Sequence, residues 1–281
     1  MNRTPERLVL VLDAPVHRTL RELEGHYRTR DVESWDELEA ALAGAAPSTV
    51  ALVNPYSGRA RGEGPSPRLR ELVWRRPSTP VVVALHVHPE RLDDIVALLA
   101  WGISEMIDLE LENNPKAALP RLRGAHARPF KRRMETELLQ YASDYAATLV
   151  RAACEVAVDG GGAPELAARF GVEPRTVGAW CRREALPPPR RLQAWMRVLL
   201  AAWLLEEPGR SVLNAARSAG YANDHALRRA MRELAGGDPS TLPREQLFET
   251  AAARMNDELR VLRERLRERR RTGRVTARDF Y

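Results

Sequence analysis

One short pattern occurs twice between residues 163 and 234 of this chain, and the repeat restricts how that segment can fold. Each copy has an alanine, a glycine four residues later and then a larger residue: Ala167, Gly171 and Val172, and again Ala216, Gly220 and Tyr221. A helix-like stretch follows each glycine, with apolar residues at Val177, Trp180 and Cys181 in the first copy and at Leu227, Ala230, Met231 and Leu234 in the second. A short helix, a glycine turn and a second amphipathic helix form a helix-turn-helix.

The second helix of such a unit is the part that can enter a DNA major groove. In the second copy, Asn223 is a good N-cap and Asp224 suits the positive end of the helix dipole. The stripe opposite the apolar one consists of His225, Arg228, Arg229 and Arg232. An arginine can bind guanine O6 and N7 with two hydrogen bonds, or clamp a phosphate. A basic helical face is often only solvated, but its place on this helix favours a DNA contact.

The first copy has a weaker polar face. Pro174 suits the first turn of its second helix, where the missing N–H costs nothing. The face opposite the core carries Arg175, Gly178, Ala179 and Arg182. Together with Thr176, the two arginines are the candidate DNA contacts of this unit. Between the two copies, residues 190–206 are apolar on more than one face, which predicts a helix buried between the units.

The two halves of the chain differ in charge. Residues 1–129 hold 17 Lys and Arg against 18 Asp and Glu, whereas residues 130–281 hold 27 against 20. The basic half is the half with the repeated motif, which fits a polyanionic partner such as double-stranded DNA. An arginine excess also follows from genome base composition, so the charge alone does not identify the partner.

Membrane insertion and secretion have no support in the sequence. No apolar run approaches the length of a membrane span, and the first residues lead directly into a strand-like run without the pattern of a signal peptide. Cys154 and Cys181 occupy apolar positions of predicted helices, which is typical of reduced core residues. We therefore expect a cytoplasmic protein with no membrane partner.

Continuous apolar runs in the first half are typical of strands buried on both faces. They are residues 8–12, 50–53, 81–85 and, more weakly, 106–107, and a further strand near residues 27–32 completes the set. Helix-like stretches lie at 17–24, 34–42, 67–74 and 90–101. Ser34 and Glu37 make a plausible capping box. The alternation of strands and helices predicts a doubly wound parallel sheet, so the whole chain is of α/β plus all-α class.

Residues 130–158 predict one long connector helix, because apolar residues recur there at helical spacing. The stripe consists of Leu138, Tyr141, Ala142, Tyr145, Leu149, Ala152, Ala153 and Val156. It can pair with its copy in another chain or pack on its own protomer, and the sequence favours neither. Asp159 and the three glycines after it end the helix, and we expect them to free the next domain.

The segment after Pro243 predicts a basic helical tail. Its apolar stripe is short, and three consecutive arginines follow it: Met255, Leu259, Leu262 and Leu266, then Arg269, Arg270 and Arg271. This pattern fits a short coiled-coil pair, an added phosphate contact or a frayed, solvated helix.

Residues 163–244 resemble the AraC-type DNA-binding domain, in which two helix-turn-helix units are joined by a long helix. The resemblance rests on residues 166–172, on 191–205 as the linker helix, on Ser211, Val212, Ala216, Gly220 and Tyr221, and on Asp238-Pro239-Ser240 near the end. It implies base-contacting positions at Arg175, Gly178 and Ala179 in the first unit and at Asp224, His225, Arg228 and Arg229 in the second. Cys181 and Met231 replace the family's usual phenylalanines and remain apolar. Because Gly178 and Ala179 cannot read base edges, we expect the first helix to position the protein more than to specify sequence.

Residues 5–125 resemble the receiver domain of bacterial response regulators in the order and length of their elements. A receiver needs an acidic pair after the first strand and an acceptor aspartate after the third, because Mg²⁺ takes carboxylate ligands. Here Asp13 remains of the pair, Asn54 stands at the acceptor position, and the family's lysine position falls on Leu109. We therefore predict a receiver-like domain that phosphorylation does not control, with Asp13 and Asn54 as its degenerate phosphoacceptor region.

Other chemistry in the first half has weaker support. Residues 54–67 form a Gly/Pro-rich loop at the sheet edge where open α/β folds bind ligands, and Arg59 and Arg61 there could meet an anion. His86 and His88 could share a face as metal ligands, but no third ligand is in view. A scaffold with no ligand is an equal alternative. With no Ser/His/Asp or Cys/His grouping and no phosphate-binding glycine loop, we expect neither an enzyme nor a bound cofactor or metal.

These expectations combine into four parts: a receiver-like domain at 1–128, a connector helix at 129–160, an AraC-type domain at 161–244 and a basic helical tail at 245–281. The leading hypothesis is a sequence-specific DNA-binding transcription regulator, with Arg228, Arg229 and His225 at one major-groove segment and Arg175 and Arg182 at the next. The alternatives are a phospho-switched response regulator and a helix-turn-helix interaction protein that no longer binds DNA. A homodimer would form through the connector helix or the receiver-like domain.

Overall fold

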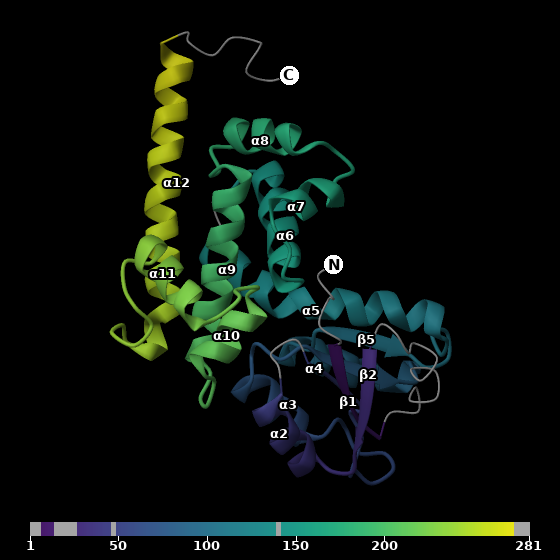
Figure 1. Cartoon of the computed structure of the whole chain (residues 1–281). Coiled ribbons are helices and arrows are strands. Elements are labelled where there is room, and N and C mark those ends of the chain that lie inside the picture. The colour runs from purple at the N-terminus through teal and green to yellow at the C-terminus, as the bar shows by residue number, and fades with distance from the viewer. Residues whose placement is uncertain (1–6, 14–26, 46–48, 139–141, 273–281) are drawn as a thin grey trace. The chain divides into compact units, whose positions relative to one another are not determined.

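The computed structural model of the chain describes residues 7–13, 27–45, 49–138 and 142–272. Contacts divide the chain into two units, Met1–Pro129 and Phe130–Tyr281 (Figure 1). The helix predicted at residues 17–24 lies outside the described residues. Within the described ranges, no helix has both the length and the apolar character that crossing a bilayer requires.

Five strands of the first unit form one parallel sheet: β1 (Arg7–Leu12), β2 (Tyr27–Val32), β3 (Val50–Val53), β4 (Val81–Leu85) and β5 (Glu105–Asp108). Their order across the sheet is β2-β1-β3-β4-β5, and every pairing is parallel. The order reverses at β1, which is the point where open α/β sheets place their ligands. The predicted doubly wound parallel sheet is confirmed.

Helices cover both faces of this sheet, which explains why its strands are apolar throughout. One face packs against α5 (Pro115–Glu137), whose Ala118, Leu122 and Ala125 join the buried side chains of alternate strand positions. The helices on the other face are α2 (Trp35–Gly44), α3 (Pro67–Arg75) and α4 (Leu92–Trp101), the last preceded by the 3₁₀ turn η1 (Pro89–Arg91).

The capping box predicted at the start of α2 forms only in half. Ser34 Oγ accepts the Glu37 N–H at 3.1 Å, as expected for an N-cap. The Glu37 carboxylate, however, accepts the N–H of Glu33 rather than that of Ser34. The N–H of Glu37, which has no acceptor within the helix, is therefore satisfied by Ser34. The return hydrogen bond from the Glu37 carboxylate goes to the residue before the N-cap.

The connector predicted as one helix consists of two, so that prediction is wrong. Helix α5 continues past Pro129 and ends at Glu137, and α6 (Asp144–Val158) begins anew. Ser143 Oγ accepts the Ala146 N–H at 3.1 Å and caps the new helix. The apolar periodicity spans the break because both helices bury their stripes in one core. The Ser-Asp pair at the start of α6 is the signal that marks the break.

The stripe of α6 is covered by its own chain. Leu149, Ala153 and Val156 belong to the buried core of the second unit, where α6 packs against α9 (Pro189–Glu206). Of the two alternatives for this stripe, the structure therefore shows packing on its own protomer. Tyr145 lies outside the stripe's buried part and is 68% exposed.

Helix α9 is the centre of the second unit. Leu192, Val198, Leu199 and Ala201 are 0% exposed, and they lie on more than one side of the helix, as predicted. The helices around it are α6, α7 (Ala163–Arg169), α8 (Pro174–Arg183), α10 (Val212–Ser218), α11 (Asp224–Leu234) and α12 (Leu247–Arg271), the last preceded by the 3₁₀ turn η2 (Arg244–Gln246).

The glycine run after α6 does not act as a free spacer, contrary to expectation. The Arg197 guanidinium on α9 donates to the carbonyl oxygens of Gly160 and Gly161 at 3.0 and 2.7 Å. A Cβ placed on Gly220 would lie 3.2 Å from the Cα of Gly160. The glycines therefore allow two backbones to approach closely, and they fix the connector against the second helix-turn-helix unit.

The C-terminal helix completes the core instead of fraying. Phe248, Met255 and Leu259 of α12 are at most 3% exposed and pack with α9. The Glu258 carboxylate accepts two hydrogen bonds from Arg191, at 2.7 and 2.8 Å, and one from Trp195 Nε1 at 2.9 Å. The first half of the predicted tail stripe is therefore covered within the protomer. Residues 273–281 lie outside the described part of the chain.

Candidate nucleic-acid interface

The first helix-turn-helix unit consists of α7 and α8, joined at Gly171. This glycine has φ +65°, a left-handed conformation that side chains resist. Val177 and Cys181 are fully buried, and the rings of Phe170 and Trp180 meet edge to face at 5.6 Å between centroids. The apolar side of α8 is thus fixed to the core, and its opposite side is left for solvent or a ligand.

The outward side of α8 carries two of the predicted contacts. Arg175 has a side chain that is 84% exposed, and its Nε lies 2.8 Å from Glu173 Oε2. Arg182 is exposed and has no ion pair within the described residues. Thr176, Gly178 and Ala179 are half-buried, so this face offers few groups that could read a base edge.

The second unit consists of α10 and α11, joined at Gly220 with φ +76°. Each helix has a side-chain cap: Ser211 Oγ accepts the Asn214 N–H at 3.1 Å, and Asn223 Oδ1 accepts the Ala226 N–H at 2.9 Å. The predicted N-cap at Asn223 is therefore present. These caps satisfy orphan N–H groups and fix where α11, the helix that would enter a groove, begins.

The outward side of α11 is basic and largely without internal partners. The apolar stripe Leu227, Met231 and Leu234 is buried. On the other side, His225, Arg229 and Arg232 are exposed, and none of them forms an ion pair with another described residue. Three donors on one exposed helical face can meet phosphates or base edges without first breaking an internal contact.

Arg228 differs from its neighbours because carboxylates already hold it. Its Nη1 lies 2.6 Å from Asp238 Oδ1 and 3.4 Å from Ser240 Oγ, and its Nε lies 3.6 Å from Asp224 Oδ2. The side chain is only 28% exposed. Two predicted contact residues, Arg228 and Asp224, are thus paired with each other, and the guanidinium presents only its remaining donors outward.

Asp238, which sequence reasoning did not select as a site residue, organises this corner. Its Oδ1 accepts the N–H of Ser240 at 3.0 Å and the hydroxyl of Ser240 at 2.7 Å. These two bonds, with a further contribution from Arg228, hold the pKa of the Asp238 carboxyl below its usual range. The signal in the sequence was the Asp-Pro-Ser turn, since Asp side chains often bond the backbone two residues on.

The outward faces of α8 and α11 lie near opposite ends of α9. Figure 1 shows α8 beyond one end of α9 and α11 beside the other. Helix α9 has 18 residues, which corresponds to a rise of about 27 Å. That length is similar to the separation of about 34 Å between successive major-groove segments on one side of a duplex.

The degenerate phosphoacceptor region of the first unit lies at the carboxyl ends of β1 and β3. Asn54 Nδ2 lies 3.4 Å from Asp13 Oδ2, so the structure brings these two predicted residues together. Leu109, at the family's lysine position, is 5% exposed and belongs to the core. These three positions therefore hold one exposed carboxylate, one amide and one buried leucine, where a receiver has carboxylates for Mg²⁺ and a lysine.

The loop after β3 is tied to α4 by a cluster that sequence reasoning missed. The Tyr56 hydroxyl donates to Asp94 Oδ2 at 2.9 Å, and the Arg91 guanidinium lies 4.5 Å from the Tyr56 ring centroid. Arg91 also bonds Asp94 at 3.0 Å and the Glu63 carbonyl at 2.8 Å. Burial and the hydrogen bond to Asp94 raise the pKa of Tyr56 to about 12. The loop is thus clamped at several points.

The histidines and cysteines that the sequence offered for metal or thiol chemistry can be placed in the structure. The described residues contain no group of three His, Cys, Asp or Glu side chains that could hold a metal ion. His86 and His88 stack on each other with their ring centroids 6.1 Å apart. Cys154 and Cys181 are free and buried, and burial raises the pKa of both thiols, that of Cys181 to about 12.

Comparison with known proteins identifies the second unit. Residues 166–245 match the model of a family described as a helix-turn-helix domain. No curated protein matches the chain. Among solved structures, full-length FixJ from B. japonicum is similar at 10% sequence identity and a TM-score of 0.34, over 82% of this chain and 97% of that chain. The family match confirms the AraC-type helix-turn-helix prediction, and the five-stranded parallel sheet fits the receiver-like one.

Proposed function

We propose that this chain, whose residues 166–245 form a helix-turn-helix domain, is a sequence-specific transcription regulator that binds double-stranded DNA. The observation that carries the proposal is the outward face of α11. His225, Arg229 and Arg232 are exposed there, and within the described residues they have no acidic partner. A polyanion that pairs with them replaces no internal contact, and release of its counterions favours binding.

In this proposal, α11 and α8 make different kinds of contact with the DNA. Arg229, Arg232 and His225 of α11 face the groove segment that specifies the sequence. Arg175 and Arg182 of α8 meet the backbone of the next segment, because Gly178 and Ala179 between them carry no side-chain group that could read a base edge. This division follows from the side chains that each helix exposes.

Arg228 contributes through the part of its guanidinium that the carboxylates leave free. Asp238 and Ser240 occupy Nη1, and Asp224 lies near Nε, whereas Nη2 has no partner among the described residues. A side chain held in this way loses less conformational entropy on binding than a free arginine. We therefore assign Arg228 to a positioned contact in the middle of α11.

The receiver-like unit acts without phosphoryl transfer in this proposal. A phosphoacceptor must be a carboxylate, and the position after β3 holds the Asn54 amide. The remaining carboxylate, Asp13, is exposed and already lies within hydrogen-bonding reach of that amide. A role in holding or pairing the DNA-binding units fits these residues better than a phosphate switch.

A homodimer is also part of the proposal, and the exposed apolar residues suggest which surface would pair the two chains. Leu149, Ala153 and Val156 of the connector stripe are covered by the core around α9 and are not available to a second chain. In the first unit, α4 exposes Leu92, Val96 and Leu99, at 57%, 65% and 55%. These residues lie on one face at i, i+4 and i+7, so we assign pairing of two chains to this helix.

The test is selection of bound fragments from a random DNA pool by the full chain, followed by affinity measurements over a range of salt. We expect an enriched motif and a complex that weakens steeply with salt. R229Q/R232Q should lower affinity for that motif by about tenfold or more. The matched control is R61Q/R70Q, which removes two exposed arginines from the first unit. A wild-type chain with no salt-sensitive complex would favour an interaction protein that no longer binds DNA.

A further inference from the structure

The distal part of α12 carries a large excess of positive charge. The helix is buried against α9 as far as Leu259. Residues 260–271, its last turns, hold seven arginines and only two glutamates. In Figure 1 these turns continue past the segment that packs on α9 toward the level of α8. This excess of charge lies outside the segment matched by the helix-turn-helix family.

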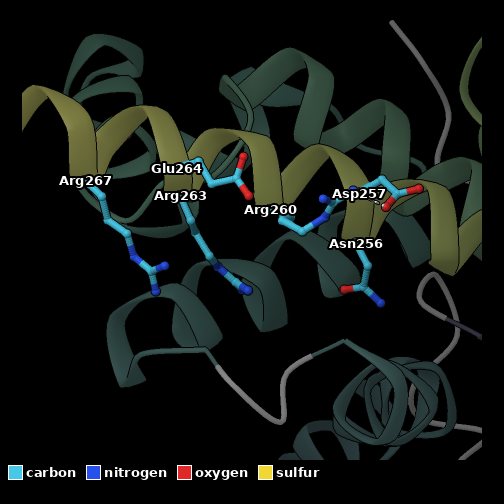
Figure 2. Close-up of a pocket in the computed structure, with 6 residues that line it drawn as sticks. All are labelled: Asn256, Asp257, Arg260, Arg263, Glu264 and Arg267. Atoms are coloured by element: carbon cyan, nitrogen blue, oxygen red, sulfur yellow. Dashed lines mark hydrogen bonds and ion pairs between the residues drawn. The ribbon is translucent and has the colours of Figure 1, made fainter.

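Three of these arginines share one face of the helix. Arg263, Arg267 and Arg270 lie at i, i+4 and i+7, and within the described residues none of them forms an ion pair. Figure 2 shows Arg263 and Arg267 projecting from the same side of α12. Two other arginines of the helix are already engaged, Arg260 with Asp257 and Arg271 with Glu268. The three therefore form a row of free cations about 10 Å long.

This row borders the first helix-turn-helix unit. Arg263, Arg267 and Arg270 line a groove together with the end of α8, represented by Arg183 and Glu184, and the start of α6. Glu184 is engaged by Arg183 at 2.9 Å and by the Ser143 hydroxyl at 2.6 Å. The carboxylate that lines this groove is thus already bonded, and arginines of both α8 and α12 border the groove.

We propose that Arg263, Arg267 and Arg270 bind backbone phosphates of the duplex beside the groove segment that α8 occupies, an inference that rests on the proposed function. Gly178 and Ala179 on the face of α8 have no side-chain donors for base edges. DNA affinity at this end of the domain must therefore come from contacts made by other residues. An arginine fork clamps phosphate oxygens with two bonds, and a row at helical spacing can follow one strand. The contact adds affinity without sequence information.

The test compares two double variants of the full chain on the selected DNA motif. R263Q/R267Q removes two charges from the proposed face, and R265Q/R269Q removes two exposed charges with the same spacing from the opposite side of the helix. For R263Q/R267Q, we expect the slope of log affinity against log salt to become shallower by about 2, with equal relative losses on matched and mismatched DNA. R265Q/R269Q should leave the slope nearly unchanged.

A hydroxyl-radical footprint gives the second measurement. The wild-type protection should extend beyond the half-site bound by α8 and retract on that side alone in R263Q/R267Q. Equal slopes for wild type and R263Q/R267Q would overturn the inference and leave an acidic protein partner as the occupant. Equal losses of DNA affinity in R263Q/R267Q and R265Q/R269Q would also overturn it, because the effect would then depend only on the net charge of the helix. If R229Q/R232Q also binds like wild type, the proposed function itself fails.

Discussion

Arg228 and Asp238 form an ion pair at the edge of the basic face of α11, with 2.6 Å between Nη1 and Oδ1. The pair links the middle of the outward helix to the turn that follows it, because Ser240 donates to the same carboxylate oxygen. A negative charge at this place has two effects on DNA binding. It repels nearby phosphates, and it holds one guanidinium in a fixed orientation.

Replacement of Asp238 should separate those two effects. In D238N the repulsion is lost, so we expect affinity for unrelated DNA to rise a few-fold. Arg228 also loses its fixed orientation, so the ratio of specific to unrelated binding should fall. Competition binding with the selected motif and a scrambled duplex measures both quantities. D257N on α12, which removes one exposed carboxylate elsewhere, is the control; an unchanged ratio in D238N would show that Asp238 does not position Arg228.

Arg229 should behave as a base contact. R229Q removes an exposed guanidinium that has no partner among the described residues, so protein stability should stay the same. Affinity for the selected motif should fall by about 1–3 kcal/mol, and tolerance should rise at one base position. A panel of duplexes with single base changes reports this. A uniform loss over the whole panel would instead identify Arg229 as a phosphate contact.

The receiver-like unit should not accept a phosphoryl group. Incubation of the full chain with a small phosphodonor and Mg²⁺ should leave its intact mass unchanged, because the position after β3 holds an amide. Intact-mass spectrometry is the measurement, and a receiver with an intact acceptor aspartate serves as the positive control. A mass increase that disappears in D13N would revive the phospho-switched alternative.

The local patterns of the sequence predict much of the fold. The apolar runs become strands because a strand buried on both faces must be apolar throughout. The glycines at 171 and 220 predict the two turns, because only a residue without a Cβ adopts their positive φ at low cost. Asn223 predicts where α11 begins, since its side chain replaces a missing backbone acceptor.

The parts that could not be predicted depend on partners distant in sequence. Periodicity shows that a stripe is buried but not what covers it. From the sequence alone, the stripes of α6 and α12 could each pair with a second chain, whereas in the structure both pack against α9. Glu258 and Arg191 are 67 residues apart, and no spacing rule connects them. For the same reason, the sequence marks Arg228 as a basic contact but does not show that Asp238 holds it.

The two turn glycines offer a matched test of packing around the second unit. G171A meets no atom within 4 Å, so it should cost only the backbone strain of a left-handed alanine, about 1–2 kcal/mol. G220A carries the same strain, and its Cβ also lies 3.2 Å from Gly160. Urea unfolding should therefore show a larger loss for G220A, by on the order of 1 kcal/mol. Equal losses would mean that the glycine run can move away from Gly220.

Glu258 should make the stability of the second unit depend on pH. Burial alone would raise its pKa, but the hydrogen bonds from Arg191 and Trp195 prevail, and the pKa of the folded state lies below the usual value. The contribution is therefore complete above the unfolded carboxyl pKa of about 4.3 and is lost as pH falls through the lower, folded value. In urea unfolding at pH 7, E258Q should cost on the order of 1–2 kcal/mol, and its difference from wild type should shrink below about pH 4. E264Q, an exposed glutamate on the same helix, should show no such difference. If the E258Q deficit persisted unchanged at low pH, its cause would be packing and not the carboxylate's charge.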